Sequence, residues 1–150
     1  MTEVGFYHLT RTPLDRALPK LLEKVVAGGM RAVVIAGSDE RVAALDAALW
    51  TYEQLSFLPH GSARDGSAED QPIWLTTDDE NPNGASVLVL TDGVQSANVG
   101  QFARCLDMFD GRDAESVAAA RERWKAMKSA GHTLAYWQQN EAGGWEKKDS

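Results

Sequence analysis

The sequence predicts an α/β fold, a single domain of 150 residues built on a mainly parallel sheet. Short apolar runs such as "AVVIA" and "VLVL" have the length of buried strands, and amphipathic segments alternate with them. Alternation of this kind places helices on both faces of the sheet, because each connecting helix must cover an apolar face. Apolar residues make up 43% of the chain and charged residues 25%, which is typical of a soluble globular domain.

The first strand–helix unit begins with a strand over Val4–Thr10. Thr12 is expected to cap the following helix, with Pro13 at its first position, where a missing N–H costs little. Pro19 lies further along, so a kink or a late helix start is expected there. The helix should end at Gly28-Gly29, because glycine tolerates the left-handed conformation that follows many helices.

The second unit pairs a near-continuous apolar strand over Arg31–Gly37 with a helix that Ser38 or Asp39 caps. Polar segments punctuated by glycine and proline indicate loops further on. The elements expected between this helix and residue 92 are a short extended piece at 56–60, loops at 61–72 and 76–86, and strands at 72–76 and 86–92.

The last third of the chain predicts a short helix passing into a strand around Leu106–Phe109, then a long helix over Asp113–Ala130. The alanine-rich start of that helix has high helix propensity, and Gly131 stands where a left-handed residue ends a helix. Alternating apolar and polar residues on both sides of Gly143-Gly144 predict a closing hairpin.

Composition restricts the classes of function. The net charge of −7 argues against sequence-independent binding of nucleic acid, because such binding needs many phosphate-neutralising cations. We expect a cytoplasmic protein, because no signal peptide or membrane-spanning run is apparent and Cys105 is the single cysteine. We predict that Cys105 is a small residue of the hydrophobic core. The three histidines are scattered, so neither a metal nor a cofactor is expected.

Two loops follow apolar strands, one after Gly37 and one containing Asp92 and Ser96. Ligands often bind at the carboxyl ends of parallel strands, so a small nucleotide-binding protein or enzyme using these loops is one alternative. Against it, "GSDER" has one glycine where a dinucleotide fingerprint needs three, and a tight turn followed by a helix cap is the favoured interpretation of these residues. No catalytic residue is predicted.

The helix "ARERWKAMKSAG" carries an unusual concentration of positive charge for an acidic chain. Helical periodicity places Arg121, Lys125 and Lys128 in one stripe, beside an apolar stripe that contains Trp124. Cations near a helix C-terminus complement its dipole, which suits Lys128, but Arg121 lies too far from Gly131 to benefit. The alternative is a receptor for a short acidic peptide with an apolar end.

A second candidate surface contains Trp50 and Phe57, in "LWTYEQLSFLPHG". Both rings can cover the edge of the sheet, or they can form a partly exposed aromatic pair that anchors a protein–protein contact. The sequence leaves these two alternatives open.

Taken together, "LDAALW", "SFLPHG" and "ARERWKAMKSAGH" resemble the landmarks of the chi subunit of bacterial DNA polymerase III, in their order and spacing. "FYHL" and "VLVLTDG" also resemble family positions, so the likeness spans about residues 4 to 138. The resemblance implies a three-layer Rossmann-like fold that binds no nucleotide. It also implies an accessory subunit, without activity of its own, in the clamp-loader assembly of DNA replication.

The resemblance further implies the partners. That family binds the acidic, phenylalanine-ending C-terminal tail of single-stranded-DNA-binding protein, and the matching positions are Arg121, Trp124 and Lys125, with Lys128 nearby. Its other surface, for a psi subunit or a helicase, corresponds to Trp50 and Phe57. Contact with DNA is expected to be indirect, and no contact with membranes is expected. This chain has Trp124 where family members often have tyrosine. Either ring can line a slot for the tail, but tryptophan makes that slot narrower.

Overall fold

The computed structural model describes the whole chain except residues 1, 11, 52–59, 63–70, 142–143 and 149–150. Its strands are β1 (Glu3–Leu9), β2 (Ala32–Ile35), β3 (His60–Ser62), β4 (Ile73–Thr76), β5 (Val87–Leu90), β6 (Arg104–Asp110), β7 (Thr133–Gln139) and β8 (Trp145–Lys148). Its helices are α1 (Leu14–Ala27), α2 (Asp39–Thr51) and α3 (Ala114–Ser129), with a short 3₁₀ helix, η2 (Val99–Gln101).

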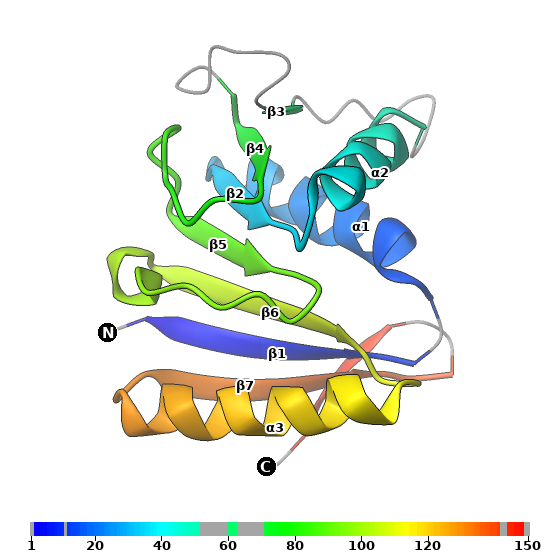
Figure 1. Ribbon diagram of the computed structural model, residues 1–150, viewed down its shortest axis with the longest axis vertical. Coiled ribbons are helices and arrows are strands. Elements are labelled where there is room, and N and C mark those ends of the chain that lie inside the picture. The colour runs from blue at the N-terminus through cyan, green and yellow to red at the C-terminus, as the bar shows by residue number, and fades with distance from the viewer. Residues whose placement is uncertain (1, 11, 52–59, 63–70, 142–143, 149–150) are drawn as a thin grey trace.

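The strands form one eight-stranded sheet in the order β3-β4-β2-β5-β6-β1-β7-β8 (Figure 1). Every neighbouring pair is parallel except β7 and β8, which form the predicted antiparallel hairpin at the end of the chain. The α/β class and the mainly parallel sheet are therefore confirmed. None of the helices in the described part of the chain is long and apolar enough to cross a bilayer.

Helices cover both faces of the sheet and make a three-layer fold. Along β2, Val34 packs into one core with α1 and α2, while Val33 and Ile35 pack into a second core with α3. Side chains alternate between the two faces of a strand, so a strand buried on both sides must be apolar at every position. This explains the continuous apolar run that the sequence shows at this strand.

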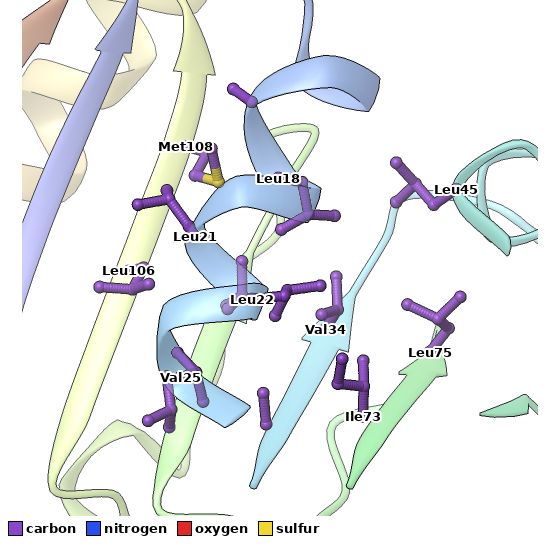
Figure 2. Close-up of a cluster of buried hydrophobic side chains, with 14 of the residues drawn as sticks. Leu18, Leu21, Leu22, Val25, Val34, Leu45, Ile73, Leu75, Leu106 and Met108 are labelled. Atoms are coloured by element: carbon purple, nitrogen blue, oxygen red, sulfur yellow. The ribbon is translucent and has the colours of Figure 1, made fainter. Parts of the chain in front are cut away.

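The first core lies under α1, whose buried face is aliphatic (Figure 2). Leu18 and Leu22 are fully buried there and lie toward Val34 on β2, whereas Leu21 and Val25 lie toward Leu106 on β6. Burying a leucine side chain contributes about 1.5–3 kcal/mol, so this face is enough to hold α1 on the sheet.

The start of α1 differs from the expectation. Thr12 does not cap the helix: the N-cap position is Pro13, and the Thr12 hydroxyl accepts a hydrogen bond of 2.8 Å from Gln139 Nε2. A late start at Pro19 is also wrong, because the helix begins at Leu14 and passes through Pro19, which is buried. The apolar contacts of the turns on either side outweigh the hydrogen bond that proline removes.

Strand β3 is a second difference, since His60 was expected to end an extended piece and Gly61 and Ser62 to begin a loop. His60, Gly61 and Ser62 have little strand propensity, but all three are buried and pair in parallel with β4. The pairing partner, and not the local sequence, decides the conformation here. The predicted helix ends are confirmed, with Gly28 as the C-cap of α1 and Gly131 at φ 89° after α3.

Candidate functional site

The candidate site lies on α3, whose two ends are fixed by local contacts. At the N-terminus Asp113 accepts hydrogen bonds from the backbone N–H of Glu115 and the hydroxyl of Ser116, at 3.4 and 2.8 Å. At the C-terminus the backbone N–H of His132 donates to the carbonyl of Met127 at 3.3 Å, which closes a Schellman motif at Gly131. These caps give the helix a fixed length and register over the sheet.

Trp124 is half-buried on the inner side of α3. Helical periodicity predicts one apolar stripe for Trp124, Val117, Ala120 and Met127, and all four pack into the second core. Its ring meets Phe6 of β1 edge to face, with centroids 5.3 Å apart, and meets Tyr136 of β7 in the same way at 6.0 Å. Both contacts lie in the favourable range for aromatic pairs. The indole is therefore held rigidly, with part of its surface exposed beside β7.

The three predicted cations, Arg121, Lys125 and Lys128, are all exposed on α3. Lys125 lies 3.3 Å from Glu122, but both side chains are more than 70% exposed, so this ion pair contributes little. Arg121 lies close enough to Tyr136 to act on its pKa: burial raises the pKa of the phenol, and the guanidinium opposes that rise.

Tyr136 is a residue that the sequence argument missed. Alternation along β7 places Leu134 and Tyr136 on the α3 side of the sheet, and this pattern was a signal that could have found them. The Tyr136 hydroxyl forms a short hydrogen bond with His8 Nδ1 of β1, and its ring also packs against Phe109 at 6.2 Å. The surface beside α3 thus consists of two fixed rings, Trp124 and Tyr136, with Arg121 next to them.

Arg123, the fourth basic residue of the helix, does not belong to this surface. Its side chain is 5% exposed, and it donates two hydrogen bonds, of 2.6 and 2.9 Å, to the Asp107 carboxylate on β6. The surface of the helix therefore carries less positive charge than the sequence suggests. An aspartate inside an otherwise apolar strand, "RCLDMF", was the available signal that a basic partner is buried nearby.

The second predicted surface falls largely outside the described residues. Trp50 belongs to the last turn of α2, but its side chain lies outside the described part, and so does Phe57. Their assignment to a partner surface stays a prediction. The reading of Cys105 as a core residue is confirmed, since its side chain is fully buried on β6.

The loops after Gly37 and at Asp92 do come together, as the alternative reading requires. Asp92 accepts hydrogen bonds from the backbone N–H of Gly37 at 3.0 Å and from Arg41 at 3.2 Å. Asp92 and Arg41 line a crevice of about 580 Å³ at the carboxyl ends of the strands. Each arginine that lines this crevice already holds a carboxylate, the other two pairs being Arg112–Asp110 and Arg123–Asp107. These carboxylates would repel a phosphate group in the crevice, so the crevice does not favour nucleotide binding.

These features define an α/β protein with a rigid cationic and aromatic strip on one helix, and with a strand-end crevice whose charges are internally paired. The chain matches the family described as DNA polymerase III chi subunit, HolC, over residues 1–135. It belongs to that family, which is a family of accessory subunits.

One curated relative supports the assignment. The chain is 31% identical over 109 residues to the probable DNA polymerase III subunit chi of Rickettsia prowazekii (strain Madrid E). The matched region covers 73% of this chain and 66% of the relative, slightly less than two thirds of its length. The family match ends at residue 135, within β7, so the rest of β7 and the whole of β8 lie beyond the matched region.

Proposed function

We propose that this chain is an adaptor that binds the acidic, phenylalanine-ending C-terminal tail of single-stranded-DNA-binding protein and links it to the clamp-loader assembly. One observation carries the proposal: three exposed cations of α3 border two fixed rings in a chain of net charge −7. Membership in the chi family supports the same partner. The protein needs no catalytic group for this role.

Each side chain of the strip has a distinct part in the proposal. Arg121 holds the terminal carboxylate of the tail, because a guanidinium makes two parallel hydrogen bonds to a carboxylate. Trp124 and Tyr136 line the slot for the terminal phenyl ring, and edge-to-face packing of such rings adds to burial of their apolar area. Lys125 and Lys128 face the aspartates of the tail, and they contribute a salt-dependent attraction.

The test is calorimetric titration of the full chain with a synthetic acidic peptide that ends in phenylalanine. Arg121→Ala should weaken binding by about 2 kcal/mol, or about 30-fold in Kd, because a charge-assisted pair of hydrogen bonds is lost. Arg112→Ala is the matched control, since Arg112 is also exposed but lies before α3. Unchanged affinity in Arg121→Ala would remove this residue from the site.

A second arm of the titration separates charge from geometry. Arg121→Lys keeps the positive charge but loses the fork that fits a carboxylate, so most of the affinity should still be lost. Removing the terminal phenylalanine from the peptide should cost a similar amount, because the ring slot is then left empty. A peptide that binds equally well without its last residue would contradict the assignment of Trp124 and Tyr136.

A further inference from the structure

The opposite face of the sheet, away from α3, carries a second group of aromatic rings on β1, β7 and β8. Tyr7 pairs in register with Trp137, and Trp137 pairs with Lys147, so these three residues form a row across the strands. The rings of Tyr7 and Trp137 are stacked, with centroids 6.2 Å apart and an angle of 10° between their planes. Trp145 meets Tyr7 edge to face at 5.0 Å.

Two hollows adjoin this row. Gly5, which has no side chain, pairs with Ala135, and together they leave a hollow of about 210 Å³ that Tyr7, Trp137 and Arg104 border. The glycine is required here, because a Cβ at position 5 would lie 2.8 Å from the Tyr7 ring. A second hollow of about 250 Å³ has the same three bordering side chains and extends to Lys24 of α1 and to Trp145.

The charges around the hollows are mainly positive. The hollows are lined by three cations, Lys24, Arg104 and Lys147. Glu3 is the one acidic side chain among the lining residues. Within the part of the chain that the structure describes, none of the three cations has a carboxylate at ion-pair distance. Glu3 is the cross-strand neighbour of Arg104, so one acidic side chain faces three cations here. In a chain of net charge −7, such a local excess of positive charge marks a surface that attracts an anion.

We propose that this face, which we call the β7–β8 platform (Tyr7, Lys24, Arg104, Trp137, Trp145 and Lys147), binds single-stranded nucleic acid. Tyr7 is only 6% exposed and supports the other two rings, whereas Trp137 and Trp145 are half-buried and keep part of their surface exposed. Exposed aromatic rings on a sheet accept stacked bases, and flanking cations follow the phosphates. The cations stand on three different elements around the rings, which suits a chain of evenly spaced charges better than one terminal carboxylate.

The β7–β8 platform is independent of the proposed tail site. Trp137, Trp145 and Lys147 all follow residue 135, where the family match ends, so half of the six platform residues lie beyond the matched region. The net charge of the chain disfavours sequence-independent binding of DNA, but this face has a local concentration of cations. Direct contact with nucleic acid is therefore added to the indirect contact expected from the family.

The test is fluorescence anisotropy of a labelled oligothymidylate of about 15 nucleotides, titrated with the full chain. Log affinity should fall against log salt with a slope of about −2, because three cations each release about 0.7 counterion from a single strand. Lys147→Glu should weaken binding about tenfold and reduce the slope to about −1.4. No binding at about 50 mM salt would overturn the proposal.

The chain contains a matched control for Lys147. Lys148 is the next residue of β8, is also exposed, and points to the other face, where it lies 3.2 Å from Glu146, so Lys148→Glu makes the same charge change away from the platform. Lys148→Glu and Arg121→Ala should both leave oligonucleotide binding unchanged. Equal loss in Lys147→Glu and Lys148→Glu would overturn the proposal, since general charge would then account for the binding.

Stacking is tested separately from charge. Trp137→Ala should weaken oligonucleotide binding about tenfold, the effect of one stacked base, with a circular-dichroism melt to verify folding. Trp145→Phe, which keeps an aromatic ring, should retain most of the affinity. Inorganic polyphosphate of similar charge should bind much more weakly than the oligonucleotide. If polyphosphate binds equally well, or if the acidic tail peptide displaces the oligonucleotide, the platform is not a nucleic-acid surface.

Discussion

The ion pair between Arg123 and Asp107 joins α3 to β6 in the interior of the molecule, and both side chains are at most 5% exposed. Removing one partner leaves the other charge buried and uncompensated. We therefore expect Asp107→Ala to lower the free energy of unfolding by about 3–5 kcal/mol, measured by urea denaturation. Glu122→Ala, which removes the exposed partner of Lys125, should change it by less than about 1 kcal/mol. Similar losses in the two variants would contradict the structural role of the buried pair.

Cys105 makes the stability depend on pH in the alkaline range. Burial, and then the nearby Asp107 carboxylate, raise the pKa of the thiol above its ordinary value of about 8.5. The unfolded chain therefore loses this proton first, and folding stability decreases as the pH rises past about 8.5, by about 1.4 kcal/mol per unit for this group. Denaturation of the wild-type protein and Cys105→Ala at several pH values should show a shallower decline in the variant.

Among the elements, α3 depends most clearly on its cap. Asp113→Ala should lower the free energy of unfolding by about 1 kcal/mol, because two donors at the helix start lose their acceptor. Asp113→Asn should be nearly neutral, since asparagine caps a helix equally well. Thermal and urea denaturation distinguish these outcomes, and equal effects of the two substitutions would assign the role to the charge of Asp113.

Local signals also decide which elements the sequence can predict. Helix α3 was predicted within one residue at each end, because its cap, its alanine content and Gly131 all lie inside the segment. Strand β3 was missed at Gly61 and Ser62 because only pairing with β4 holds them extended. Thr12 was misread for the same reason: its partner, Gln139, is 127 residues away in sequence. The exposed cations of the site, Arg121, Lys125 and Lys128, were predicted without Arg123, but the burial of Arg123 against Asp107 was not, since Asp107 lies on another element.

At the scale of the whole molecule, the sheet order separates the two proposed surfaces. Alternation along β7 turns Tyr136 toward α3 and Trp137 toward the opposite face, so adjacent residues serve different surfaces. The alternation along β7 is visible in the sequence, but the strand order that gives these residues their neighbours is not. The crossovers from β1 to β2 and from β6 to β7 pass on opposite sides of the sheet, and no local pattern encodes the strand order that results.

This separation predicts that the acidic tail peptide and an oligonucleotide bind at the same time. The sheet lies between the two ligands and salt screens their charges, so a saturating amount of oligothymidylate should change the Kd of the peptide by less than about twofold. Titration of the peptide into the preformed complex measures this coupling directly. Arg121→Ala should remove only the peptide response, and Lys147→Glu should weaken only the oligonucleotide response. Mutual displacement would mean that the two ligands share one surface, and the assignment of separate faces would then be wrong.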